Sequence, residues 1–239
     1  MQYIQTNGIF LLIVILSSRI VRPISETYDK QRRFITDAGH ELKTPITIIE
    51  AGTEILELDF GENEWVNDIR QQARRLSNLT ADLIFLSRME EPENRTMIDF
   101  PLSDVVGETV DSFQALAVTQ NKNLIRNIEP MLSLYGDEKG IRQLISILLD
   151  NALKYSSEEG AIRMSLKKQN HSIHLVVENA VDEISDETVK NMFERFYRGD
   201  PARSSNKKGY GIGLSVAKAV VEVHKGKISA SSITMPEIT

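Results

Sequence analysis

The chain has 239 residues, a formal net charge of −6 and 41% hydrophobic residues. This composition is typical of a globular protein with one large or two modest domains, and the acidic balance argues against a surface that binds nucleic acid. Because the sequence contains no cysteine, disulfide frameworks, cysteine-ligated zinc and thiol catalysis are excluded.

An apolar run near the N-terminus extends from Gly8 to Leu16, and Arg19 and Arg22 follow it. A helix of this length covers about 14 Å, whereas the core of a bilayer needs about 30 Å, so the run is too short to span as written. Arginines in this position fit the cytoplasmic end of a membrane helix. We therefore expect residues 1–23 to be the remnant of a transmembrane helix and its juxtamembrane segment, with the other domains on the cytoplasmic side of the inner or plasma membrane. A buried or interfacial helix start is the alternative.

Residues 24–90 are expected to form a helical hairpin, with helices over 25–58 and 64–89 and a turn at Gly61. Apolar residues recur on both helices at intervals of seven, which indicates that each helix packs on other helices. They are Tyr28, Ile35, Leu42, Ile49 and Leu56 on the first helix, and Trp65, Ile69, Leu76, Leu79, Leu83 and Leu86 on the second. Two antiparallel helices cannot bury such stripes fully between themselves, so we expect a homodimer whose hairpins form a four-helix bundle.

His40 lies on the first predicted helix, away from this stripe. At about 100° per residue its imidazole is roughly 140° from Ile35 and roughly 160° from Leu42, so it points toward solvent or a docking partner. Glu41 follows it and could accept its ring proton, whereas Pro45 removes a backbone donor and is expected to bend the helix. Taken alone, His40 also fits an ordinary surface histidine.

The polar segment 91–96 contains a proline and is expected to be a linker, after which the pattern changes to mixed strands and helices. Strands are expected at 97–100, 123–128, 132–135, 161–168, 172–179 and 227–232, and helices at 102–117, 137–155, 185–196 and 211–225. Residues 97–239 should therefore form an α/β sandwich, in which an antiparallel-rich sheet is covered on one face by about three helices. The whole chain is then expected to be an α+β protein.

Polar residues in this second domain are suited to binding phosphate. Asn151, Lys154 and Tyr155 share one face of a predicted helix, where an amide oxygen can ligate Mg²⁺ and an ammonium can offset phosphate charge. Arg198 could reach a γ-phosphate, and the basic segment 203–208 could form a lid. An ordinary polar surface and a solvated run of charges are the alternatives.

A glycine-rich turn opens the last long helix. Gly209, Gly211 and Gly213 alternate before Leu214. The missing side chains would let backbone N–H groups approach phosphates at the positive end of a helix. A merely flexible turn is the alternative.

Taken together, five motifs resemble those of the sensor histidine kinases of bacterial two-component systems, in the order of that family and over about residues 24 to 232. They are the phosphoacceptor box Phe34–Pro45, the asparagine box Asp150–Ser156, the phenylalanine box Phe193–Arg198, the second glycine box Gly209–Leu214 and the helix-closing segment His224–Ile228. The resemblance implies a dimerising phosphoacceptor hairpin followed by a GHKL-type ATP-binding domain. The family's C-terminal strand is expected to be truncated in this chain.

The resemblance also implies an activity, namely that of an ATP-dependent protein-histidine kinase that uses ATP and Mg²⁺. His40 would be the phosphoacceptor, Glu41 its general base, and Asn151 a ligand of Mg²⁺. Arg198 would steady the γ-phosphate. The phosphoryl group would pass to an aspartate in the receiver domain of a response regulator, and Thr44 would help to dephosphorylate that regulator.

Two departures from the family pattern affect the expected nucleotide site. Asn179 stands where the family has the aspartate of the adenine site, and Val181 and Glu183 replace two glycines. A neutral amide contributes about 1 kcal/mol less than a charge-assisted hydrogen bond, so we expect weaker ATP binding. Ile147 replaces an earlier asparagine, which removes one possible ligand of Mg²⁺. A non-catalytic dimeric scaffold that binds a response regulator is therefore the alternative function, whereas the hairpin with His40 argues against an ATPase of the chaperone or topoisomerase type.

Overall fold

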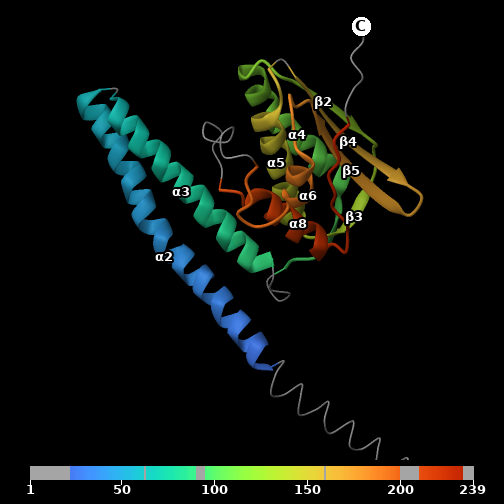
Figure 1. Cartoon of the computed structure of the whole chain (residues 1–239), viewed down its shortest axis with the longest axis horizontal. Helices are drawn as coiled ribbons and strands as arrows, with labels where there is room; N and C mark the ends of the chain where they lie inside the picture. Colours follow the sequence, from blue (N-terminus) through green and yellow to red (C-terminus); the bar gives the residue numbers. More distant parts are fainter. Residues whose placement is uncertain (1–21, 62, 90–94, 159, 200–209, 234–239) are drawn as a thin grey trace, which may run out of the picture. The chain divides into compact units, whose positions relative to one another are not determined.

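The computed structural model describes residues 22–61, 63–89, 95–158, 160–199 and 210–233, with the side chains of the first helix described from residue 35 onward. The chain divides into two compact units, with the division between Arg88 and Met89. Figure 1 shows a pair of long helices in the first unit, and strands and shorter helices in the second. Nearly all of the expected membrane remnant, most of the expected linker and the expected lid lie outside the described residues.

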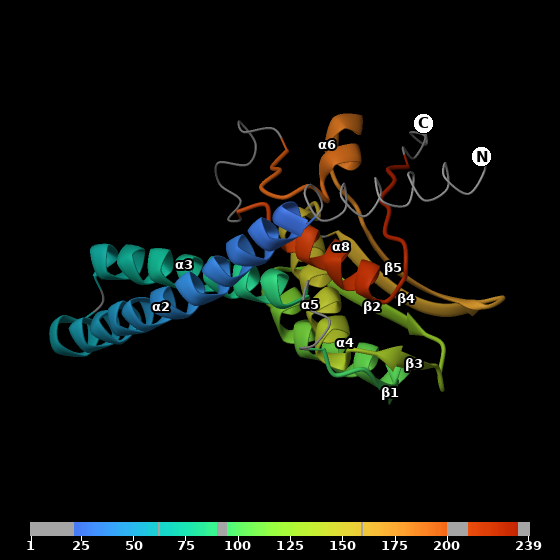
Figure 2. The ribbon, with the colours of Figure 1, turned by 90° about the horizontal axis from the view of Figure 1, so that it is seen from below.

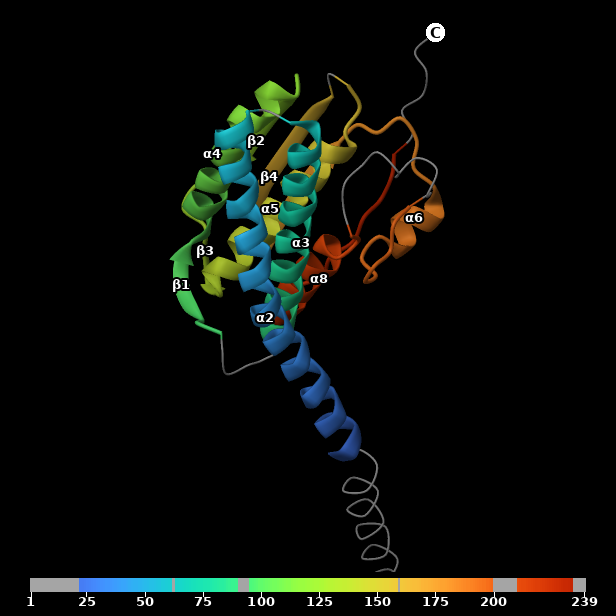
Figure 3. The same cartoon turned by 90° about the vertical axis from the view of Figure 1, so that its left-hand side faces the viewer.

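The first unit is an antiparallel helical hairpin, as predicted. Helix α2 (Arg22–Phe60) has 39 residues and continues through Pro45, and helix α3 (Glu64–Met89) has 26 residues. Figures 1 and 3 show the two helices side by side along α3. Gly61 begins the turn between them with a φ of 76°, a left-handed conformation that glycine adopts without steric cost.

The two helices of the hairpin meet along a seam of mostly small side chains. The buried residues of this seam recur at intervals of seven: Gly39, Ile46 and Thr53 on α2, and Ala73, Thr80 and Ser87 on α3. The predicted aliphatic stripe is a different series, since Leu42, Ile49 and Leu56 are 48%, 46% and 42% exposed. The seven-residue period is therefore right, and small residues such as Gly39 allow a close approach to Ile84. Large residues are buried as well, namely Ile46, Ile84 and Leu86, the last of which belongs to the predicted stripe of the second helix.

The second unit contains two sheets. Strand β1 (Ile98–Pro101) pairs antiparallel with β3 (Ser133–Gly136). Strands β2 (Asn123–Ile128), β4 (Ala161–Gln169) and β5 (Ser172–Asn179) form a mixed sheet in the order β2-β4-β5, with β2 parallel and β5 antiparallel to β4. Antiparallel pairing predominates, as predicted, and five of the six predicted strands are present in the described chain.

Helices α4 (Leu102–Thr119) and α5 (Glu138–Tyr155) pack against this mixed sheet and against each other, and α8 (Gly213–Val223) packs against α5. Figure 2 shows α4, α5 and α8 together on one side of the strands. The alternation along β4 explains this layer, because Ile162, Met164 and Leu166 are fully buried while Arg163 is exposed. The α/β sandwich expected from the sequence is thereby confirmed.

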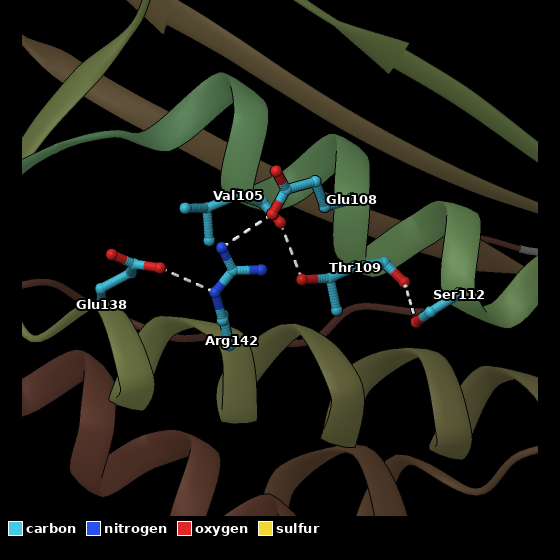
Figure 4. Close-up of polar contacts among 6 residues, drawn as sticks. All are labelled: Val105, Glu108, Thr109, Ser112, Glu138 and Arg142. Carbon is cyan, nitrogen blue, oxygen red and sulfur yellow. Dashed lines mark hydrogen bonds and ion pairs between the residues drawn. The ribbon is translucent and has the colours of Figure 1, made fainter.

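An arginine joins α4 to α5 at the edge of this layer (Figure 4). Arg142 donates from Nη2 to Glu108 and from Nε to Glu138, each at 2.8 Å. The hydrogen bond to Glu108, and then that to Glu138, raises the pKa of Arg142 above its ordinary value. Because the arginine side chain is 38% exposed, solvent screens the bridge and we expect it to contribute little to stability.

Three predicted elements differ in the structure. Helix α6 (Asp186–Asn191) ends earlier than the predicted helix 185–196; turns follow it, and Phe196, which has a φ of 63°, donates from its N–H to the carbonyl of Gly211 at 2.8 Å. Helix α8 begins at Gly213 rather than at Gly211, because Gly211 has a φ of 72°, which a helix cannot contain. The described segment 227–232 is not a strand, since a β-ladder requires a partner edge that local alternation cannot supply.

Candidate functional site

His40 lies on the exposed side of α2, beside an unusually close approach of the two helices. The preceding Gly39 is buried, and a Cβ placed on it would lie only 2.4 Å from Cγ1 of Ile84 on α3. One turn earlier, the hydroxyls of Thr36 and Ser87 form a hydrogen bond of 2.8 Å between the helices. The hairpin is therefore held in a defined register next to the imidazole.

Arg88 makes the polar contact that the structure describes for this imidazole. Its Nη2 lies 3.0 Å from Nε2 of His40, which is 48 positions away in the sequence. Sequence analysis singled out Glu41 as the partner of the ring and missed Arg88, because no local spacing links the end of α3 to the middle of α2. Glu41 and Thr44 are both exposed on α2.

The phosphate-binding residues predicted on α5 lie in its last turns. Asn151 is half-buried, whereas Lys154 and Tyr155 are exposed. Lys154 forms an ion pair with Asp150 one turn earlier, so its ammonium already has a partner on its own helix. Beyond the helix end, the N–H of Ser157 donates to the carbonyl of Ala180 at 2.9 Å.

This last contact joins the end of α5 to the end of β5, where Asn179 lies. The Asn179 side chain is half-buried, and its Nδ2 makes a long hydrogen bond of 3.5 Å to the carbonyl of Ala180. The structure thus brings the predicted asparagine box and the predicted adenine site together, although the two are well separated in the sequence. Val181 and Glu183, which replace the family's glycines, are exposed beyond it.

The turn before α8 has no space for a side chain at Gly211. Gly211 has a φ of 72°, and a Cβ on it would lie 2.5 Å from the backbone carbonyl oxygen of Tyr197. A Cβ on Gly213 would lie 3.4 Å from Cγ2 of Ile147. Ile147, which replaces an asparagine of the family, therefore lies next to this turn. Leu214 is half-buried in the first turn of α8, and Gly209 lies outside the described residues.

The phenylalanine box is tied to the same turn through the hydrogen bond from Phe196 to Gly211. Arg198 is exposed and follows Phe196 by two positions. It therefore lies close in the chain to the backbone that is hydrogen-bonded to the turn before α8. A tight glycine turn at a helix N-terminus with a nearby guanidinium is an arrangement that suits phosphate oxygens. Within the described ranges no cluster of three carboxylate or histidine side chains could hold a metal, so a cation here would depend on Asn151 and on the phosphates themselves.

Comparison with known proteins bears on the same two regions. Residues 30–92 match the family model of the His Kinase A (phospho-acceptor) domain, and residues 136–236 match that of the histidine kinase-, DNA gyrase B-, and HSP90-like ATPase. The sensor protein DltS of Streptococcus agalactiae is 36% identical over 218 residues, or 90% of this chain. The chain belongs to the sensor histidine kinases of bacterial two-component systems. Its predicted phosphoacceptor His40 falls within the first match, and its predicted nucleotide site within the second.

Other sensor kinases are similar over nearly the same span. CusS of Escherichia coli K12 is 31% identical over 95% of this chain, and YkoH of Bacillus subtilis is 33% identical over 95%. This sensor kinase chain spans about half the length of these curated relatives, 54% of DltS, 48% of CusS and 50% of YkoH. None of the helices in the described ranges is both long and apolar enough to cross a membrane.

Solved structures agree with the fold of the kinase. The histidine kinase AdeS of Acinetobacter baumannii has a TM-score of 0.54 and 25% identity, covering 77% of this chain and 86% of that one. Full-length ShkA in complex with AMPPNP has a TM-score of 0.66 and covers 80% of this chain and 41% of that one, but at 17% identity this likeness shows the fold alone.

Proposed function

We propose that this chain is the phosphotransfer core of a sensor kinase, in which His40 accepts the γ-phosphoryl group of ATP and passes it to an aspartate of a response regulator. The observation that carries the proposal is an exposed imidazole on the hairpin, in the same chain as a tight turn in which Gly211 has no space for a side chain. The first supplies a nucleophile that a partner can reach. The second supplies backbone N–H groups for phosphate.

The reaction requires one bond to form and one to break. The lone pair on a ring nitrogen of His40 attacks the γ-phosphorus, and ADP leaves with the electron pair of the broken P–O bond. Glu41, the next residue in the chain, takes or orients the proton on the other ring nitrogen. Because both side chains are exposed, neither needs the hairpin to open.

The second unit would hold and orient the nucleotide. Asn179 is suited to accept a hydrogen bond from the adenine amino group, and Tyr155 and Lys154 flank the end of α5 nearby. The N–H groups of Gly211 and Gly213, with Gly209 and Leu214, would contact phosphate oxygens at the start of α8. Arg198 would steady the γ-phosphate. When bound, Mg²⁺ held by Asn151 would neutralise charge on the phosphates.

Three partners follow from this function. The exposed aliphatic stripe of α2 fits a second copy of the chain, which would complete a four-helix bundle. The face that bears His40 and Thr44 fits a receiver domain, to which the kinase would both give and remove a phosphoryl group. Attachment to the membrane would occur through residues before the described part of α2.

Incubation with γ-labelled ATP tests the proposal. The wild type should acquire acid-labile, alkali-stable label and His40→Gln should acquire none, whereas His174→Gln, which alters an exposed histidine on β5, should label as the wild type does. Equal label in the wild type and in His40→Gln would reject His40 as the phosphoacceptor.

The neutral Asn179 at the expected adenine position favours one rival function, a dimeric scaffold that binds a response regulator without ATP. Titration of the full chain with ATP and Mg²⁺ separates the two functions. Saturable binding that Gly211→Ala weakens supports the kinase. Binding of a receiver domain without any binding of nucleotide supports the scaffold.

A further inference from the structure

Asn179 lies at the end of β5 with a firmly held backbone and a weakly held side chain. In the sheet it pairs with Ile162 of β4, which is fully buried. The carbonyl of the next residue, Ala180, accepts a hydrogen bond of 2.9 Å from the N–H of Ser157, just beyond α5. By contrast, the hydrogen bond from Nδ2 of Asn179 to the carbonyl of Ala180 is 3.5 Å long. A bond of this length is too weak to hold the amide in one of its two orientations, which differ by a half-turn about χ2.

A half-turn of this amide exchanges an acceptor for a donor at the same place. The amide oxygen Oδ1 accepts hydrogen bonds, and the amide nitrogen Nδ2 donates them. An ionised aspartate presents an acceptor in either orientation. Asn179 can therefore complement a donor or an acceptor on a bound molecule, whereas the aspartate of the family pattern complements only a donor.

The two classes of purine base differ in this respect. Adenine carries an amino group at C6, which donates, whereas guanine carries an oxygen there, which accepts. Hypoxanthine, the base of inosine, also carries an oxygen at C6. A carboxylate opposite that oxygen sets two acceptors against each other, and an unpaired acceptor costs about thirtyfold in affinity. An asparagine avoids this cost, because its Nδ2 donates to the oxygen.

We infer that Asn179 lets the kinase use nucleoside triphosphates of 6-oxopurines as phosphoryl donors in addition to ATP. This inference deepens the proposed phosphotransfer function and rests on it, because it takes the purine to lie against Asn179. The side chain is half-buried beside the end of α5, as a contact to a base requires. The chemical step is the same for both classes of nucleotide. His40 bonds to the γ-phosphorus, and the nucleoside diphosphate leaves with the electron pair of the broken P–O bond.

Titration calorimetry of the full chain with Mg²⁺ and either ATP or inosine triphosphate (ITP) tests the inference through binding alone. All variants carry His40→Gln, so that no phosphoryl transfer consumes the nucleotide. ITP is the probe because hypoxanthine lacks the 2-amino group of guanine, which keeps the comparison with adenine at C6 and the adjoining N1. With Asn179 in place, the Kd values for ATP and ITP should differ by less than about tenfold.

Asn179→Asp should make the site selective for adenine. Binding of ATP should tighten about fivefold, because the hydrogen bond from the amino group becomes charge-assisted, and binding of ITP should weaken about thirtyfold. The matched control is Asn170→Asp, which makes the same change at an exposed turn residue beyond the other end of β5 and should leave both Kd values unchanged. Asn179→Leu removes donor and acceptor together, so it should weaken both nucleotides by similar factors.

A preference for ATP of about tenfold or more with Asn179 in place would overturn the inference, and so would an unchanged ratio of the two Kd values in Asn179→Asp. Wild-type chain incubated with γ-labelled ATP or γ-labelled ITP should acquire label on His40 from both, and label from ATP alone would also overturn the inference. Comparable binding of ATP and ITP in a chain whose wild type acquires label from neither would reject the proposed kinase function while leaving the role of Asn179 in base recognition intact. Binding of neither nucleotide would reject both.

Discussion

The two units of this kinase bury their apolar residues to different extents. The second unit encloses large apolar side chains, among them Ile145, Leu149, Leu153, Ile162, Met164 and Leu166, which are fully buried. The hairpin encloses small residues such as Gly39 and Thr53 together with Ile46, and it leaves the large stripe of α2 at its surface, with Leu42 and Ile49 nearly half exposed. The second unit therefore has a core of its own, whereas the hairpin presents apolar surface that a further partner must cover.

The largest effect is expected from Leu149→Ala, which should remove about 3 kcal/mol from the free energy of unfolding of the second unit. Leu149 is 0% exposed, so its truncation leaves a cavity. Hydrogen exchange at the amides of β4 should accelerate. Trp65 on α3 is the one tryptophan of the chain, so its fluorescence reports the unfolding of the hairpin. This unfolding transition should be unchanged in Leu149→Ala.

Leu116→Ala on α4 is the matched control, because that leucine is 43% exposed. Its cost should stay below about 1 kcal/mol. An equal cost at both positions, or a parallel shift in the Trp65 transition, would contradict the assignment of separate cores.

A somewhat smaller effect is expected from Ile49→Asp, which should weaken self-association of the chain about a hundredfold, or by about 2.7 kcal/mol. A carboxylate in the exposed stripe would be buried without a partner if two hairpins pack there. Sedimentation across a range of concentrations measures the change. The control Thr47→Asp adds the same charge on another side of the helix and should associate as the wild type does. A wild type that is monomeric at all concentrations would show that a second copy does not cover the stripe.

Gly39→Ala should destabilise the hairpin by about 2 kcal/mol, because the added methyl group collides with Ile84 in the seam. Gly52→Ala lies on the same helix, and a Cβ there meets nothing within 4 Å, so this control should stabilise α2 by about 0.8 kcal/mol. Thermal unfolding followed by Trp65 fluorescence measures both changes. If Ile84→Ala does not relieve the cost of Gly39→Ala in the double variant, the close approach is not its cause.

The smallest effect tests the end of α8 in the second unit. Lys225 has a φ of 57° directly after the helix, and Lys225→Gly should stabilise this unit by about 1 kcal/mol because glycine adopts that conformation without strain. Lys218→Gly within α8 should instead destabilise the unit by about 1 kcal/mol. Chemical denaturation measures both, and a loss of stability in Lys225→Gly would show that the lysine side chain outweighs the backbone strain.

Local patterns predicted most of the secondary structure. The bounds of β2, β5 and α3 agree with the sequence-based ranges, because each has a regular period and a clear break at its ends. Prediction failed where a distant partner decided the outcome. The predicted helix 185–196 could not continue to Phe196, whose N–H donates to the distant Gly211, and the predicted strand 227–232 pairs with no other strand in the described chain.

The candidate site divides in the same way. Taken alone, His40, Asn151 and Gly211 each also fitted an ordinary surface or turn, and the phosphotransfer chain with its nucleotide site was predicted from the resemblance of five motifs to those of the family, in the family's order. Arg88 was not predictable as a partner of His40, because the contact spans 48 positions.

By itself, the sequence determined the period of the hairpin helices, the alternation of the strands and the chemical groups available for phosphotransfer, since these depend on residues close together in the chain. Only the tertiary structure decided that the series Gly39, Ile46 and Thr53 of α2 forms the seam and that Leu42, Ile49 and Leu56 lie exposed, because a helix with two stripes contains no local preference between them. It also decided which donor meets Nε2 of His40. That contact requires α3 to return antiparallel along α2 in one register, which depends on how Gly39 and Ile84 pack rather than on either helix alone.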